Sequence, residues 1–306
     1  MKLYFIVGMS RSGTTWLTRS LNKHSKITAF GETCFFGRND IGKPNYDYEN
    51  IKFLKKKFRL LDEFNKTGDL FKNALVNATK NYSSNSNKIP KQKIFYDFAK
   101  EISHISGSSF IIEKTPHHIN HFREIKEYFP ETKFLVCFRR PEGFLLSYKH
   151  QGDRKEDSIK INFNNSYHPL IALIIYKKFE SKIHQIRKNK YAMLIDFNSI
   201  IERPKKLLNQ VQKFLEIPIE KIITKKTNSS FENLNIPKLS VEDKLWLNIL
   251  CKSETKLNFI EKLVSPLVMI FSLLKLIKAG FFIFYILLKT MKFSRIIPYV
   301  ISYIKK

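Results

Sequence analysis

The sequence predicts an α/β domain in which helices cover both faces of a parallel β-sheet. Short, continuous apolar runs of the buried-strand type occur at residues 3–7, 27–30, 110–112, 134–138 and 191–195. Segments with helical spacing of apolar residues lie between and after them, at residues 14–24, 142–150, 168–188 and 204–215. Strands that alternate with helices are typical of a parallel sheet whose two faces are both buried.

Length and composition indicate a folded protein with a large core. The chain has 306 residues, of which 43% are hydrophobic, and its formal net charge is +27. Of the 54 basic residues 43 are lysine, and Asn, Ile and Phe are also plentiful, which is the mixture that A/T-rich codons produce. We therefore expect codon bias as the main source of the charge, attraction of an anionic ligand or membrane as a second, and no specific nucleic-acid partner.

The cysteines and the N-terminus indicate a cytoplasmic protein. Cys34, Cys137 and Cys251 are odd in number and have no metal-like spacing, which favours a reducing compartment. The first residues run directly into an apolar strand and do not have the pattern of a signal peptide.

A glycine-containing turn at residues 8–13 connects the first strand to the first helix. Backbone N–H groups and the helix N-terminus make such a turn a binding site for an anion. The spacing of Gly8 and Gly13 matches the G-x-x-x-x-G-K-[ST] loop of nucleoside-triphosphate-binding proteins, but Thr14 stands where that loop has lysine. The cation is instead Arg11.

The strand at 134–138 ends in Arg139-Arg140, where a magnesium-binding enzyme would have an aspartate. This disfavours a nucleotide kinase, and no metal site is predicted.

The segment Arg11-Ser-Gly-Thr-Thr-Trp-Leu17 resembles the 5′-phosphosulfate loop of the sulfotransferases that use 3′-phosphoadenosine 5′-phosphosulfate (PAPS). The resemblance implies a P-loop-like three-layer fold with a central parallel sheet flanked by helices, here followed by a helical C-terminal tail. It also implies that the loop grips the 5′-phosphosulfate of the donor and that an aromatic ring lies against the adenine. The residues concerned are Arg11, Ser12, Gly13, Thr14, Thr15 and Trp16.

A second block, residues 134–141 followed by Ser147-Tyr-Lys-His150, resembles the 3′-phosphate site of the same family. In that family an arginine at a strand end and a serine eight residues later hold the 3′-phosphate, and Arg139 and Ser147 have this offset. An arginine offers a planar fork suited to two phosphate contacts. Arg140 departs from the acidic or amide residue that usually precedes the proline, and it adds positive field.

Two further segments resemble the catalytic parts of the family. Gly31-Glu32-Thr33 is similar to the segment of the tyrosylprotein and carbohydrate branches whose glutamate is the general base, and this implies that role for Glu32. Glu113-Lys114-Thr115-Pro116 is similar to the segment whose lysine stabilises the sulfuryl group and the leaving bisphosphate, a role implied here for Lys114, assisted by Arg11. His117 is the rival base, but it lies one residue beyond the position of the histidine that cytosolic sulfotransferases use.

The composition changes in the C-terminal part of the chain. We expect a sulfotransferase domain at residues 1–260, with a helical insertion on the acceptor side at about 45–105, and an amphipathic tail at 261–306. A helix is predicted to start at Ser265-Pro266. On a continuous helix, lysines would fall within one arc of an otherwise apolar surface, which favours a helix at a membrane interface. These lysines are Lys275, Lys278, Lys289 and Lys292. The alternatives are a helix that packs on the protein's own core, one that forms a dimer interface and one that spans the membrane.

Three hypotheses follow from the sequence. The first is a PAPS-dependent sulfotransferase that modifies a hydroxyl or amine of an unidentified acceptor, a glycan or a lipid among the candidates. Residues 265–304 are then expected to contact an anionic membrane, so that the enzyme would lie peripherally on its inner face. The alternatives are a P-loop nucleotide kinase and a non-catalytic basic adaptor that binds membranes.

Overall fold

The computed structural model describes residues 1–36, 45–46, 70–78, 80, 89–153, 157–224, 237–253 and 255–290. Two compact units are present: residues 1–138 with 182–227, and residues 139–181 with 228–306. The division at residue 260 and the role of residues 45–105, as expected from the sequence, stay predictions. Residues 47–69, 79 and 81–88 of the expected helical insertion lie outside the described residues.

The first unit contains a five-stranded parallel sheet in the order β2-β5-β1-β6-β7. All five predicted strands are present, and β1 lies at the centre of the sheet. In register, Ile6 of β1 lies opposite Lys114 of β5, and Gly8 lies opposite Cys137 of β6, so several strand ends meet at one edge. The strands are β1 (Lys2–Gly8), β2 (Ile27–Gly31), β5 (Phe110–Lys114), β6 (Phe134–Phe138) and β7 (Ala192–Asp196).

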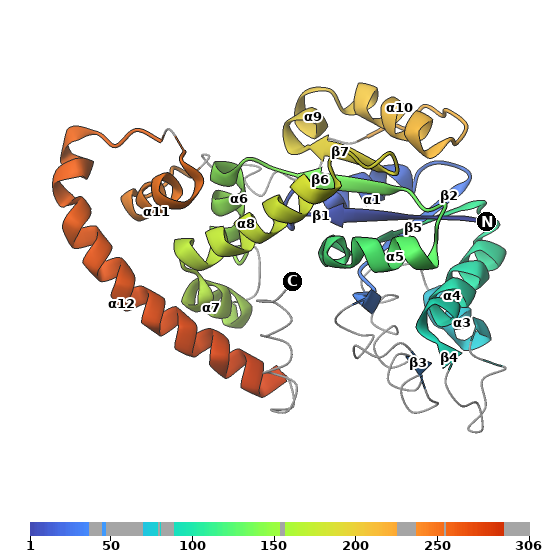
Figure 1. The fold of residues 1–306 in the computed structure, drawn as a ribbon, viewed down its shortest axis with the longest axis horizontal. Coiled ribbons are helices and arrows are strands. Elements are labelled where there is room, and N and C mark those ends of the chain that lie inside the picture. The colour runs from blue at the N-terminus through green and yellow to red at the C-terminus, as the bar shows by residue number, and fades with distance from the viewer. Residues whose placement is uncertain are drawn as a thin grey trace. The chain divides into compact units, whose positions relative to one another are not determined.

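Helices cover both faces of this sheet, as predicted (Figure 1). On one face Ile6 belongs to a core cluster with Leu17 of α1 (Thr14–Leu21) and Leu208 of α10 (Pro204–Leu215), and α9 (Phe197–Glu202) packs there too. On the other face Phe5 stacks on Phe95 of α4 (Lys91–Ser106) and on Phe134. Each such buried side chain contributes roughly 1.5–3 kcal/mol.

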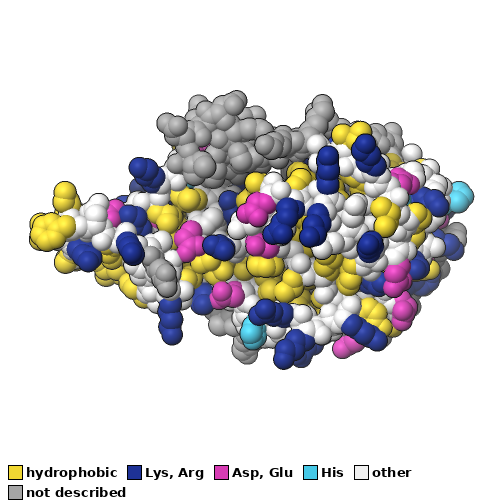
Figure 2. Space-filling view, turned by 90° about the horizontal axis from the view of Figure 1, so that it is seen from above, with side chains coloured by type: hydrophobic (Ala, Val, Ile, Leu, Met, Phe, Trp, Pro, Cys, Tyr) yellow, Lys and Arg dark blue, Asp and Glu magenta, His cyan; other side chains and the backbone are white. Residues whose placement is uncertain are grey.

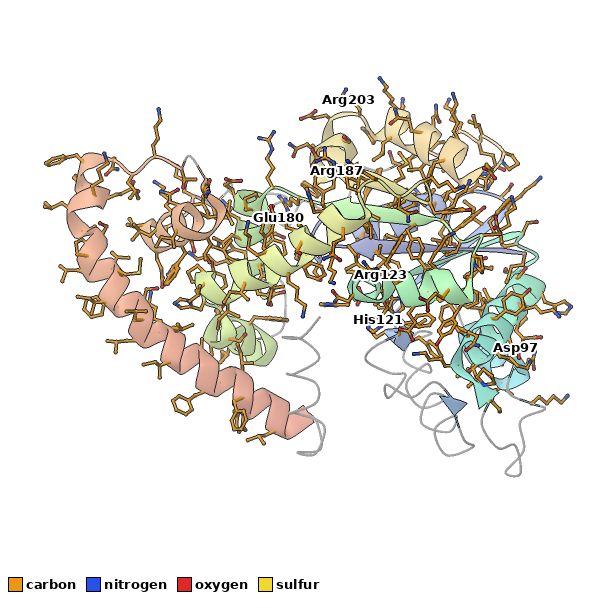
Figure 3. All side chains as sticks on the ribbon, in the orientation of Figure 1. Asp97, His121, Arg123, Glu180, Arg187 and Arg203 are labelled. Carbon is orange, nitrogen blue, oxygen red and sulfur yellow. The ribbon has the colours of Figure 1, made fainter. Side chains whose placement is uncertain are left out.

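The connection from β5 to β6 contains the turn η2 (Pro116–His121) and α5 (Phe122–Tyr128). His121, labelled in Figure 3, ends η2, and its Nδ1 lies 2.8 Å from Glu124 Oε2. Glu124 also pairs with Lys91, the first residue of α4. The remaining described elements of this unit are α3 (Leu70–Ala78) and the antiparallel pair β3 (Asn45–Tyr46) and β4 (Ile89–Pro90).

The second unit is helical. Asp243 of α11 is fully buried and accepts hydrogen bonds from Lys149 Nζ and Tyr167 Oη, both at 2.7 Å. Asp243 and Ser240 also form a capping box at the start of α11. The helices here are α6 (Pro141–Lys149), α7 (Asp157–Ser166), α8 (Pro169–Ile186, whose residues from 182 on belong to the first unit), α11 (Val241–Cys251) and α12 (Phe259–Thr290).

The predicted helix start at Ser265-Pro266 is wrong, because α12 begins at Phe259 and Pro266 lies inside it. Asn258 Oδ1 accepts the N–H of Glu261 at 2.8 Å, and the N–H of Asn258 donates to Glu261 Oε2 at 2.9 Å. This reciprocal cap satisfies the helix N-terminus one to two turns before Pro266. The serine and proline therefore do not mark the boundary.

The helix α12 has one packed side and one exposed apolar side. Ser272 and Ala279 are buried, and Ser272 Oγ accepts the indole N–H of Trp246 at 2.9 Å. The segment from Phe259 to Tyr285 is, by length and composition only, apolar enough to cross a membrane. Figure 2 shows Lys and Arg side chains spread over the viewed face among acidic ones, so the net charge is not gathered in one patch there.

Candidate active site

The predicted phosphate loop has the backbone of an anion-binding turn. Arg11 and Gly13 have left-handed φ values of 66° and 87°, and Gly8 has φ 121°. The loop is held close to the sheet, since the N–H of Met9 donates to Cys137 O at 2.9 Å, and a Cβ on Gly8 would lie only 2.1 Å from that oxygen. Alternation of right- and left-handed residues turns successive N–H groups to one side, which suits an anion.

The side chains of this loop differ in burial. Ser12 is fully buried, and its Oγ donates to Met9 O at 2.5 Å, so it braces the turn from inside. Thr14 is buried and starts α1, while Arg11 and Thr15 are exposed. Trp16 is partly buried and packs against the core cluster next to α1. The roles of these residues toward a donor stay predictions.

Glu32 and Lys114 form an ion pair at the carboxyl edge of the sheet. Gly31 and Lys114 lie opposite each other at the ends of β2 and β5, and Lys114 Nζ donates to Glu32 Oε1 at 2.5 Å. The Lys114 side chain is 9% exposed and that of Glu32 is 48% exposed. The structure thus brings together the two residues to which the sequence assigned the base and the cation.

Gly31 leaves the room that the Lys114 side chain occupies. A Cβ on Gly31 would lie 2.6 Å from Lys114 Cε and 3.1 Å from its Nζ. Lys114 also acts on the end of β6, because its charge works against the burial that raises the pKa of the Cys137 thiol to about 12. Lys114 ends β5, which lies between β2 and β1, the strand that leads into the phosphate loop.

Arg139 and Ser147 both belong to the second unit, at the start of α6 and on its second turn. Arg139 directly follows β6 in the chain, and Pro141 is the first residue of the helix. Ser147 is buried, Arg139 is half-buried and Arg140 is exposed.

Gly143 lies against the Arg139 guanidinium. A Cβ on this glycine would lie 2.5 Å from Arg139 Nε. Gly143 thus makes room for the guanidinium.

His117 is exposed, whereas its neighbour His118 is fully buried. The N–H of Phe36 donates to His118 Nε2 at 3.1 Å, so this nitrogen carries no proton, and Nδ1 lies 3.0 Å from Glu113 Oε2. His118 is therefore tied into the core. Of the two histidines His117 alone has the exposure that a rival base needs.

Sequence reasoning missed the buried Glu113 and the spacing role of Gly143. The signal for Glu113 was present, because a carboxylate inside the apolar run Phe110-Ile-Ile-Glu-Lys114 must have buried donors around it. Gly143 gave no signal, since a glycine in the first turn of a helix has many causes. No group of three or more His, Cys, Asp or Glu residues that could hold a metal ion occurs in the part of the chain that the structure describes.

Comparisons with known proteins identify the family of the chain. The family model described as "Sulfotransferase family" matches residues 4–221, more than half of the chain. No curated protein sequence matches. Among solved structures, the sulfotransferase domain from the Synechococcus PCC 7002 olefin synthase has a TM-score of 0.52 at 14% identity, over 89% of this chain and 94% of its own.

Two other solved structures are less similar in shape. The sulfotransferase domain from the curacin biosynthetic pathway has a TM-score of 0.49 at 16% identity, over 72% of this chain and 75% of its own. A sulfotransferase from Alicyclobacillus acidocaldarius has a TM-score of 0.45 at 15% identity, over 75% of this chain and 87% of its own. The Synechococcus domain shares the fold, and the family match covers the loop, the Glu32–Lys114 pair and α6. The chain therefore belongs to the sulfotransferase family.

Proposed function

We propose that the protein transfers a sulfuryl group from PAPS to a hydroxyl or amine of its acceptor, with Glu32 as general base. The observation that carries the proposal is the Glu32–Lys114 pair at the carboxyl edge of the sheet, in the same compact unit as the phosphate loop. A partly exposed carboxylate beside a largely buried ammonium provides a proton acceptor and a cation for developing charge.

The proposed step balances with these groups alone. Glu32 takes the proton of the acceptor O–H or N–H, and the acceptor atom forms a bond to sulfur. The bond between sulfur and the 5′-phosphate oxygen breaks, and its electron pair stays on the leaving 3′,5′-bisphosphoadenosine. Lys114 and Arg11 stabilise the negative charge on the sulfuryl and leaving oxygens, as cations do in phosphoryl transfer.

Lys114 has a second task under this proposal. In the structure its ammonium donates to Glu32, and an ammonium has three donors. We infer that it keeps one donor on Glu32 and offers the others to the sulfuryl oxygens when the donor is bound. Because its side chain is only 9% exposed, its attraction for these oxygens is screened less than that of a surface lysine.

The donor's 3′-phosphate would be bound by Arg139 and Ser147, with Arg140 adding positive field. Arg139 is half-buried and Ser147 is buried. A thermal-shift comparison tests the donor assignment, because a ligand of the folded state raises the melting temperature by mass action. We expect 3′,5′-bisphosphoadenosine to raise it more than ATP with magnesium; the reverse order would favour a kinase.

The base assignment is tested by two substitutions. Glu32→Ala should lower kcat by roughly 10²–10⁴, the usual contribution of a positioned base, and should leave bisphosphate binding intact. His117→Ala should keep substantial activity. The opposite pattern would move the base role to His117.

We also infer that α12 binds an anionic membrane surface, which would favour a membrane-borne lipid or glycolipid acceptor. Its exposed side carries Leu263, Leu267, Ile270, Leu274 and Ile277, each at least 58% exposed. At 100° per residue these side chains fall within an arc of about 80°, opposite the buried Ser272 and Ala279. Single exposed apolar residues are common on soluble proteins, but a contiguous apolar surface of this kind marks an interaction site.

Charge complementarity favours lipid headgroups as the partner of this surface. Lys262 and Lys278 are exposed and lie at the two borders of the apolar arc. Lys275 is also exposed, but its Nζ lies 3.1 Å from Glu242 Oε2, so part of its charge is compensated inside the second unit. Side chains of Lys289 and Lys292 lie outside the described part. Basic borders beside an apolar stripe are typical of helices at an anionic interface.

Vesicle flotation tests this inference. The full chain should float with vesicles that contain anionic lipid and less with neutral ones, and Ile270→Glu with Ile277→Glu should abolish flotation. Failure of the full chain to float, or flotation that the double variant retains, would overturn it. A dimer in light scattering that the double variant dissociates, without flotation, would assign the surface to a second copy of the chain instead.

A further inference from the structure

Glu113 is a buried charge near the carboxyl end of β5, next in the chain to Lys114. It is 0% exposed and lies between Phe5 and Phe30, its register partners on β1 and β2. These neighbours belong to the phenylalanine-rich face of the sheet. A carboxylate in such a place is costly unless donors surround it.

The donors come from the segment that follows Glu32. Glu113 Oε1 accepts the N–H of Thr33 at 3.1 Å and the Thr33 hydroxyl at 2.8 Å. It also accepts the Thr115 hydroxyl at 2.5 Å, and Thr115 Oγ1 in turn accepts the N–H of Cys34 at 3.1 Å. Glu113 therefore holds Thr33 directly and Cys34 through Thr115.

Oε2 of the same carboxylate faces His118. Its Nδ1 lies 3.0 Å from Oε2, and its Nε2 accepts the N–H of Phe36. The N–H and hydroxyl of Thr33 and the hydroxyl of Thr115 all donate to this carboxylate, and the ring proton of His118 is on Nδ1, which faces it. A carboxyl group that meets only donors is ionised. Burial opposes ionisation, but the interaction with His118 and the hydrogen bonds from the two threonine hydroxyls outweigh it, so the pKa of Glu113 is lowered.

We infer that Glu113 is a positioning residue for the sulfuryl transfer proposed above, on which this inference rests. By holding Thr33, Cys34 and Phe36, it fixes the backbone that carries Glu32 in place relative to Lys114. Glu113 itself has no exposed atom and does not meet the substrate. A base that must lie within hydrogen-bond reach of its proton loses rate when its backbone moves, and a displacement of about 1 Å can cost about 100-fold.

Two substitutions test the inference. Glu113→Gln keeps the shape of the side chain. Both carboxylate oxygens of Glu113 face donors, so the amide N–H₂ that replaces one of them must face a donor too, and at least one hydrogen bond is lost. Thr33→Val removes only the hydroxyl and serves if the first variant does not fold. We expect kcat to fall about 10- to 100-fold in either variant, while KM for the donor and the dissociation constant of 3′,5′-bisphosphoadenosine change less than about 3-fold.

Thr28→Val is the matched control. Thr28 is also buried on β2, and its hydroxyl lies 2.8 Å from Ser108 Oγ, with no contact to Glu113. The same loss of a hydroxyl should lower the melting temperature and leave kcat unchanged. If all three variants show the same small change in kcat, the role of Glu113 is structural only and the inference is overturned.

A double-substitution cycle separates this inference from the proposed function. If Thr33 acts through Glu32, Thr33→Val should change the residual rate of Glu32→Gln by less than 2-fold. If Glu32→Gln is inactive and Thr33→Val and Glu113→Gln have wild-type kcat, the positioning role fails while the base role stands. If Glu32→Gln itself keeps wild-type kcat, the proposed role of Glu32 as general base fails, and with it the positioning role of Glu113.

Discussion

Gly143→Ala tests the 3′-phosphate site through the space that this glycine leaves for Arg139. The new Cβ would lie 2.5 Å from Nε, 3.2 Å from Cζ and 3.3 Å from Nη2 of Arg139. Favourable contacts between heavy atoms begin near about 3.5 Å, so the guanidinium must retreat by about 1 Å. The obstructed atoms are the flexible end of a side chain, and alanine is the better helix former by about 0.5–1 kcal/mol, so stability should not fall.

The expected functional effect is much larger. Hydrogen bonds to a charged partner contribute about 1.5–3 kcal/mol, and a guanidinium displaced by about 1 Å from a phosphate loses most of this. Binding of 3′,5′-bisphosphoadenosine should therefore weaken about 10- to 150-fold, as measured by calorimetry. Adenosine 5′-monophosphate lacks the 3′-phosphate and should bind Gly143→Ala and the wild type alike.

The control for Gly143→Ala is Gly280→Ala in α12, where nothing lies within 4 Å of the added Cβ. Gly280→Ala should change neither the affinity for 3′,5′-bisphosphoadenosine nor that for adenosine 5′-monophosphate. Arg139→Ala should weaken bisphosphate binding at least as much as Gly143→Ala. Bisphosphate affinity equal to the wild type in both Arg139→Ala and Gly143→Ala would refute the phosphate role. A loss of more than about 2 kcal/mol in the stability of Gly143→Ala would refute the packing argument.

Two further predictions concern stability. Burial opposes ionisation of Glu124, but hydrogen bonds from His121 and Lys91 outweigh it and lower the Glu124 pKa from 4.5 to about 2. The stability that this provides is complete above pH 4.5 and is lost as the pH falls towards 2, so urea unfolding should show a loss of up to about 3 kcal/mol over this range that Glu124→Gln lacks. In the second unit, Asp243→Ala leaves Lys149 without its buried partner, and urea unfolding should show a loss of about 2–4 kcal/mol. An unchanged midpoint would show that Asp243 contributes nothing net.

The sequence predicted well those elements whose signals lie in neighbouring residues of the chain. The apolar run at 3–7 followed by Gly8 and Gly13 gave strand, turn and helix correctly, because strand burial, left-handed turn residues and helix periodicity are all local properties. Boundaries were predicted less well where two signals compete. At α12 the serine and proline signal at 265–266 gave way to the reciprocal cap of Asn258 and Glu261.

The sequence by itself determined which residues are chemically suited to bind a donor and to transfer a proton: Arg11, Glu32, Lys114, Arg139 and Ser147. It also determined the parallel sheet, since buried strands alternating with helices leave few other arrangements. What only the tertiary structure decided is which of them meet. Lys114 and Glu32 are 82 positions apart, and their pairing depends on β2 and β5 being neighbours in one register. The two sides of α12 were likewise decided by packing, because the lysines that the sequence places on one arc do not say which part of the apolar surface its own protein covers.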